Sequence, residues 1–168
     1  MLSNILLKME SKSNNSDNNN TKEIEEEKKK YEFLEHTADI YVASYGKNLN
    51  EIFENSALAL FDTMTDVKKI DRRFIENVKV KGHDEFALLY NWLEYFLIKF
   101  EIENKLFSKF EVKEIRKRNS EFYLEASIHG EYFNPEKHPS KVEIKAITYH
   151  NMKIKYNGYF IAKFLLDI

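Results

Sequence analysis

The stretch YEFLEHTADIYVASY, residues 31–45, places a compact polar cluster between two apolar runs. The apolar run that follows, residues 40–45, is rich in the β-branched and aromatic residues typical of a strand. The cluster itself holds Glu35, His36, Thr37 and Asp39. Polar groups at such a junction are candidates for a functional site. An ordinary turn is the alternative, because Thr and Asp side chains in turns often hydrogen-bond their own backbone.

The other end of the chain favours the functional interpretation. The sequence ends in FLLDI, residues 164–168, so Asp167 lies one residue before the terminal carboxylate of Ile168. These carboxylates follow an apolar run that has the pattern of a buried strand. A polar cluster near the start of the domain and a second one at its end are therefore candidates for one shared site.

The composition is that of one globular domain. A chain of 168 residues with 43% hydrophobic residues, 13 Phe and 10 Tyr can bury a core of single-domain size. The net charge of -2 gives no basic excess of the kind that nucleic-acid binding usually requires. The lack of cysteine excludes disulfides, thiolate catalysis and cysteine zinc sites. No apolar run approaches the roughly 18 residues of a membrane span, so we expect a cytoplasmic or nuclear protein.

The N-terminal segment differs in composition from the rest. Residues 1–28 are rich in Asn, Lys and Glu, with the runs SKSNNSDNNN (11–20) and EIEEEKKK (23–30) at its centre and end. Such a segment has too few apolar side chains to offset the entropy lost on ordering. We expect residues 1–28 to be a disordered extension and residues 29–168 to form the domain.

Two helices are expected in the first half of the domain. Asn48 with Glu51 has the pattern of a helix N-cap, and the apolar residues from Leu49 to Met64 follow helical spacing. Residues 74–81 are typical of a strand closed by Gly82. Asp84 then begins a second helix, whose apolar stripe is so broad that the helix must be covered on more than one side.

The second half has the period-two pattern of strands. Residues 122–128 alternate between apolar and polar, and residues 130–141, which hold both prolines, are expected to form a loop. Further strands are expected at 142–147 and 152–156, and Asn157-Gly158 is a strong hairpin signal. The last strand, 159–166, is apolar on both faces and should lie inside its sheet. The sequence predicts a single α+β domain with two helices packed on a mixed or antiparallel β-sheet.

Several motifs resemble the archease family. They are YEFLEHTAD and the residues after it up to Asp66, EIKAITYHNMKI (143–154), LYNWL (89–93), GEYFNPEKH (130–138) and the final LLDI. The resemblance covers nearly the whole chain after residue 30. It implies a non-enzymatic cofactor of the RtcB-type RNA ligase, the metal- and GTP-dependent enzyme that joins tRNA halves in tRNA splicing. Such a cofactor promotes guanylylation and multiple turnover of the ligase.

The same resemblance implies a metal site. The family's ligands correspond here to Asp39 of the HTAD motif, Asp167 and the terminal residue Ile168. Two aspartates and a terminal oxygen are hard, anionic ligands that suit Ca²⁺, Mg²⁺ or Mn²⁺ better than zinc, and we expect calcium. His36, Thr37 and His150 are expected near the ligands or facing the partner.

Two other classes of function stay open. A metal-dependent hydrolase could use Asp39 and His36 as an acid and base pair, but the sequence has no Gly-rich phosphate loop and no GxSxG elbow. A chaperone-like protein-binding module is the second alternative, although it would not require carboxylates at both ends of the domain. We expect a protein partner, the RNA ligase, with no strong direct binding of nucleic acid and no membrane contact.

Overall fold

The structure is a computed structural model that describes residues 29–36 and 38–168. Ten elements follow one another along the chain: β1 (Tyr31–Leu34), β2 (Ile40–Gly46), α3 (Leu49–Met64), the 3-10 helix η1 (Val67–Lys69), β3 (Phe74–Gly82), α4 (Glu85–Glu103), β4 (Lys105–Arg118), β5 (Glu121–Tyr132), β6 (Ala146–Tyr156) and β7 (Phe160–Asp167). Our expectation of a disordered extension concerns residues 1–28, which lie outside the described residues.

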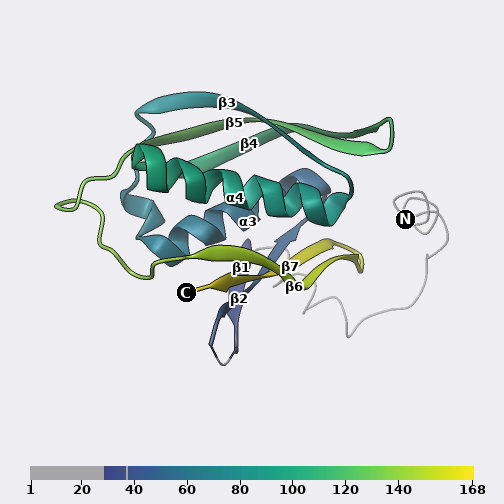
Figure 1. Ribbon diagram of the computed structural model, residues 1–168, viewed down its shortest axis with the longest axis horizontal. Helices are drawn as coiled ribbons and strands as arrows, with labels where there is room; N and C mark the ends of the chain where they lie inside the picture. Colours follow the sequence, from purple (N-terminus) through teal and green to yellow (C-terminus); the bar gives the residue numbers. More distant parts are fainter. Residues whose placement is uncertain (1–28, 37) are drawn as a thin grey trace.

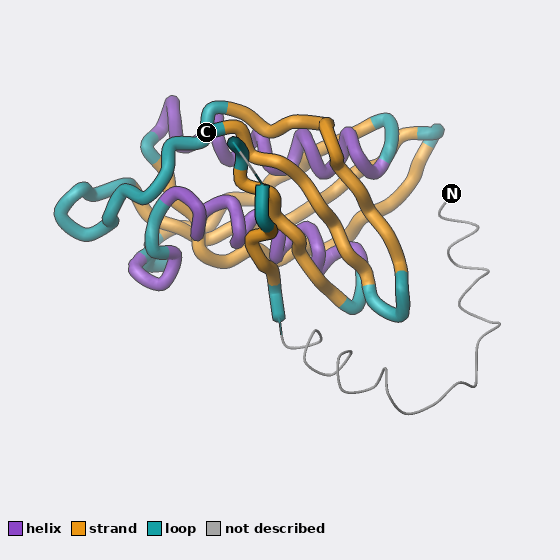
Figure 2. Tube along the Cα trace, turned by 90° about the horizontal axis from the view of Figure 1, so that it is seen from below, coloured by secondary structure: helices purple, strands orange, loops and turns teal. Residues whose placement is uncertain are grey.

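The strands form two antiparallel sheets with the two helices between them (Figure 1). One sheet has the order β1-β2-β7-β6 and the other the order β3-β5-β4. Helix α3 packs on β2 of the first sheet and β4 of the second, and α4 packs on β6 and β3. Figure 2, seen from below, shows strands of the first sheet side by side across the molecule. Both helices are therefore covered on two sides.

The helices begin where the capping residues predict. The Asn48 side chain accepts a hydrogen bond from the Glu51 amide at 2.9 Å, and the Glu51 carboxylate accepts one from the Lys47 amide at 2.7 Å. The Asp84 carboxylate accepts from the Ala87 amide at 2.7 Å at the start of α4. These bonds satisfy amides that have no partner within the helix, which fixes both starting points.

The core fills the space between the helices and the two sheets, and aromatic side chains lie at its centre. Phe61 of α3 and Phe96 of α4 meet edge to face at 5.6 Å, and Phe96 contacts Phe107 of β4 at 5.6 Å. Trp92 is fully buried, and its indole N–H donates to the Phe53 carbonyl of α3 at 2.9 Å. The broad apolar stripe of α4 is needed because one side of the helix faces each sheet.

The α+β class, the two helices and the single domain are confirmed. The expected single sheet is in fact two sheets, because helices buried on two sides need a sheet on each side. The strand expected at 142–147 is wrong over residues 142–145, which belong to the connection between β5 and β6. Residues 146–156 then form one strand, with a bulge between Thr148 and Lys153, rather than two. The hairpin signal at Asn157-Gly158 is confirmed, and Gly158 has a positive φ of 83°.

Two further expectations are confirmed. Strand β7 lies inside its sheet, between β2 and β6, as its two apolar faces predict. Residues 121–132 form β5, in which buried and partly buried residues alternate, so the expected loop begins after Tyr132 and not at Gly130. Neither helix, over the described residues, has the length and apolar composition needed to cross a membrane.

Candidate functional site

The pairing of β2 with β7 brings the two predicted aspartates to the same end of the sheet. Ile40 pairs with Leu166 in an antiparallel register. Asp39 directly precedes Ile40, in the turn before β2, and Asp167 directly follows Leu166, so both residues lie at this end of the strand pair. The fold therefore gathers carboxylates from near the start and from the end of the domain.

Lys145 holds the end of the chain in place. Its amide donates to the Asp167 carbonyl at 2.8 Å, and its ammonium donates to the main-chain oxygen of Ile168 at 2.8 Å. Asp167 and Ile168 are both exposed, although β7 before them is buried. The terminal residues thus have a defined position while their oxygens remain accessible to solvent or to a ligand.

His36 lies against Asp39, as expected from their spacing. Its Nδ1 accepts a hydrogen bond from the Asp39 amide at 3.4 Å and lies 3.7 Å from the Asp39 carboxylate. The ring also packs against Tyr41, with the two ring centroids 6.1 Å apart. Since Nδ1 faces the Asp39 amide, this nitrogen acts as an acceptor, and His36 orients the turn that carries Asp39.

His150 lies in the bulge of β6. Its amide donates to the Thr148 hydroxyl at 3.0 Å, and the side chain is exposed. The next residue, Asn151, has a positive φ of 57°, and its carbonyl accepts a hydrogen bond from the Tyr41 hydroxyl at 3.2 Å. Tyr41 thus connects the His36 turn to the β6 bulge. Burial raises the pKa of the Tyr41 phenol, so this group is a neutral donor at pH 7. Thr37 lies outside the described residues.

An open pocket of about 440 Å³ adjoins Asp39. Its apolar wall is built from β1, β2 and the β5–β6 connection by Phe33, Leu34, Ile40 and Val142. Asp62 at its edge accepts hydrogen bonds from the Tyr31 hydroxyl at 2.9 Å and the Lys141 ammonium at 3.0 Å. A partner's side chain could reach this pocket and the Asp39 carboxylate together.

The chemistry of these donors fits a hard divalent cation. Asp39, Asp167 and the end of the chain supply only oxygen atoms, the ligand type that Ca²⁺, Mg²⁺ and Mn²⁺ prefer. Within the described ranges no group of three or more His, Cys, Asp or Glu side chains is arranged to hold a metal ion. A site here therefore depends on a main-chain oxygen as its third ligand and on ligands from water or a partner.

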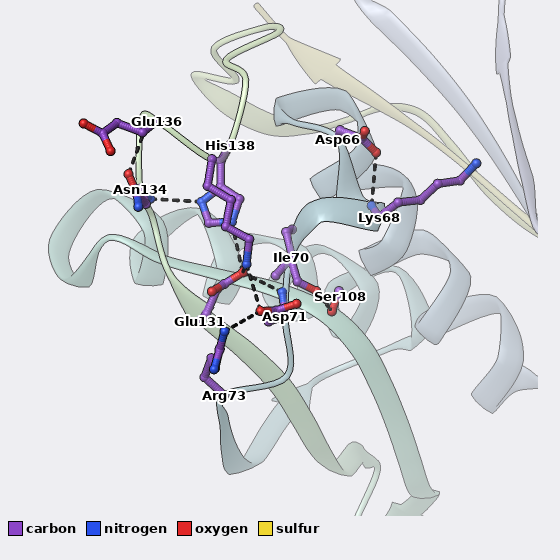
Figure 3. Close-up of polar contacts among 11 residues, drawn as sticks. Asp66, Lys68, Ile70, Asp71, Arg73, Ser108, Glu131, Asn134, Glu136 and His138 are labelled. Atoms are coloured by element: carbon purple, nitrogen blue, oxygen red, sulfur yellow. Dashed lines mark hydrogen bonds and ion pairs between the residues drawn. The ribbon is translucent and has the colours of Figure 1, made fainter.

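Sequence reasoning missed the residues that position the site. Lys145 and Tyr41 each hold part of it, but an isolated lysine and a strand tyrosine carry no sequence signal for such a role. A buried polar pair, for which the sequence suggested no role, joins the β5–β6 connection to the end of β5. His138 is fully buried, its Nδ1 accepts from the Asn134 amide at 2.9 Å, and its Nε2 lies 3.0 Å from the Glu131 carboxylate (Figure 3).

Comparison with known proteins agrees with this architecture. A family profile described as the Archease protein family matches residues 31–168. The chain belongs to the archease family. "Protein archease" of Sulfurisphaera tokodaii is 47% identical over 140 residues, which is 83% of this chain and 99% of that protein. "Protein archease" of Pyrococcus abyssi is 45% identical over 141 residues, with the same coverage. The expected family is therefore confirmed.

Two solved structures are similar to this archease. The solution structure of Methanobacterium thermoautotrophicum protein 1598 has a TM-score of 0.71 and 33% identity, over 83% of this chain and 99% of the other. The crystal structure of an archease from Thermotoga maritima, described as a possible chaperone, has a TM-score of 0.52 and 18% identity, over 80% and 94%. The second similarity supports the fold alone.

Proposed function

We propose that this protein is a non-enzymatic, metal-binding cofactor of an RtcB-type RNA ligase in tRNA splicing. The observation that supports it is that the β2–β7 pairing carries Asp39, Asp167 and the chain end to the same end of the β1-β2-β7-β6 sheet. Among the described residues, Lys145 donates to a terminal oxygen of Ile168, while His36 faces Asp39 with a ring nitrogen that accepts a hydrogen bond. The anionic oxygens at this end of the sheet are therefore left accessible to a cation.

Asp39, Asp167 and the terminal carboxylate of Ile168 would hold the divalent ion in this proposal. We expect calcium first, with magnesium or manganese as alternatives. When bound, the ion supplies a positive centre with coordination positions open to oxygens of the partner. Lys145 fixes the position of the chain end, and His36 and Tyr41 fix the turn of Asp39. The protein contributes no nucleophile and no general acid or base.

The partner is expected to be a protein rather than a nucleic acid. The chain carries 26 Lys and Arg against 28 Asp and Glu, so it has no overall basic charge that would attract RNA. The open pocket beside Asp39 has an apolar wall, which is suited to a side chain of a protein partner. Stimulation of the ligase would therefore depend on contact between proteins.

Multiple-turnover ligation by the cognate ligase tests the proposal. A tag after Ile168 converts the terminal carboxylate into an amide and adds bulk at the site, so stimulation should fall sharply. The same tag before Met1 should leave stimulation unchanged. Equal stimulation by both proteins, at matched circular dichroism, would show that the chain end is outside the working site. Ligation, hydrolysis or phosphatase activity of the purified protein alone would instead indicate an enzyme.

A further inference from the structure

A second pocket adjoins the β5–β6 connection (residues 133–145) and shares Lys141 and Val142 with the pocket beside Asp39. It has a volume of about 410 Å³ and lies between the C-terminal ends of α3 and α4 and this connection. The apolar part of its lining comes from four parts of the fold and includes Met64, Leu97, Phe100, Phe133 and Ile144, and the exposed Ser140 lies among the polar residues of the lining. A size of this order is typical of sites for small organic molecules.

Thr65 provides the unusual feature of this pocket. The residue ends α3 and is only 2% exposed. Its hydroxyl finds no hydrogen-bond partner within the part of the chain that the structure describes. Buried hydroxyls in proteins are nearly always paired, because an unpaired one lowers stability. A hydrogen-bonding group of a ligand could supply the missing partner.

The charged residues of the pocket lie at its exposed rim. Glu101 and Glu143 are exposed, and the Lys141 ammonium donates to the carbonyl and the carboxylate of Asp62. The interior therefore has no charge that would compensate a buried ion, and burial of an unpaired ion is costly. A polar rim around an apolar interior with one hydroxyl is suited to a neutral molecule.

We propose that the Thr65 pocket binds a small, neutral, mostly apolar molecule that carries one hydrogen-bonding group, and that this group pairs with the Thr65 hydroxyl. Phe100 and Phe133, which meet edge to face at 5.8 Å, make a flat aromatic ligand the best fit. The proposal does not depend on the metal site or on the ligase. The pocket proposal and the proposed function can therefore fail independently of each other.

The test uses the full chain and two probes that differ in one hydroxyl group, p-cresol and toluene. Titrations followed by ¹H–¹⁵N NMR should show saturable shifts of amides around Thr65, Leu97 and residues 141–144. We expect p-cresol to bind about fivefold more tightly than toluene, since a net hydrogen bond contributes roughly this much. Absence of saturable binding, or shifts confined to another surface, would overturn the proposal.

Variants identify the contact. Thr65→Val keeps the shape but removes the hydroxyl, so it should abolish the preference for p-cresol while toluene binds as before. Because the change removes an unpaired polar group, the variant should melt no lower than the unaltered chain. Leu97→Trp fills the pocket and should abolish binding of both probes. Val142→Trp, on the partly exposed wall, serves the same purpose if Leu97→Trp does not fold. Persistence of the p-cresol preference in Thr65→Val would contradict the proposed contact.

Discussion

The β5–β6 connection has a cluster of carboxylate and histidine groups near each of its ends, and the two clusters differ in how well the protein satisfies them. At the first, the His138 side chain is 0% exposed and that of Glu131 11%. The second lies at the end of the sheet where Lys145 contacts the chain end, and there the side chains of His36 and Asp39 are 26% and 30% exposed. The same residue types therefore occur in a buried and in an accessible environment.

The buried cluster is paired with donors of the protein itself, three of which converge on one oxygen of Glu131. The Glu131 carboxylate accepts from the Lys137 ammonium, the Asp71 amide and His138 (Figure 3). His138 also accepts from the Asn134 amide, so all its polar atoms are paired. The accessible cluster has fewer internal donors for its carboxylates. The difference indicates that the first cluster holds the fold together and that the second is available to a ligand.

Removal of the buried histidine should give the largest effect on stability. His138→Ala removes one donor to the Glu131 carboxylate, leaves the Asn134 amide without its acceptor, and opens a cavity where the buried ring lay. We expect the free energy of unfolding to fall by about 3 kcal/mol, since the loss of buried hydrogen bonds adds to the loss of packing. Urea unfolding measures this loss.

His36→Ala is the matched control, since His36 is exposed and beside a carboxylate. Its free energy of unfolding should stay within about 0.5 kcal/mol of that of the unaltered chain. Equal losses in the two variants would remove the distinction between a structural and an accessible cluster.

The acid stability of the protein should depend on Glu131. Burial acts to raise the pKa of this carboxyl, but hydrogen bonds from Lys137, the Asp71 amide and His138 outweigh it and lower the pKa below 4.5. A lowered pKa in the folded state contributes stability that is fully present above pH 4.5 and is lost as the pH falls through the folded pKa. The stability difference between the unaltered chain and Glu131→Gln should therefore shrink as the pH falls below 4.5. A difference independent of pH would show that the charge of Glu131 does not contribute.

The sequence predicted the helix caps and the hairpin turn better than it predicted how the strands divide into two sheets. The caps at Asn48 and Asp84 and the hairpin at Asn157-Gly158 depend on neighbouring residues, so they could be read directly. The division into two sheets depends on long-range pairing of strands, for which a single sequence carries no direct signal. Residues 142–145 have the apolar and polar alternation of a strand, but they belong to the β5–β6 connection. Their main chain holds this connection in place, for example where the Lys145 amide donates to the Asp167 carbonyl.

The candidate site shows the same limit. The carboxylates of Asp39 and Asp167 could be named because of motifs that resemble the archease family, and the register of β2 and β7 then places both residues at the same end of the sheet. The role of Lys145 could not be predicted, because it depends on how the connection meets the end of β7. The burial of Glu131 and His138 likewise follows from tertiary packing and not from their spacing.

Deletion of residues 1–28 should have the smallest effect. Their composition offers few apolar side chains for the core, and both clusters are built from residues after Lys29. A chain that starts at Lys29 should match the full chain in its urea midpoint and in stimulation of the ligase. A large drop in the midpoint would show that the extension contributes to the domain.

Calorimetric titration with Ca²⁺ and Mn²⁺ tests the central claim most directly, namely that Asp39 and Asp167 form the accessible, metal-binding cluster. The unaltered chain should bind at least one of the ions, and binding should raise its thermal midpoint by mass action. Asp39→Asn and Asp167→Asn should each abolish the heat of binding without loss of fold, whereas Glu114→Gln, at an exposed carboxylate on the other sheet, should bind normally. Undiminished binding by both aspartate variants, or no binding by the unaltered chain, would contradict the account.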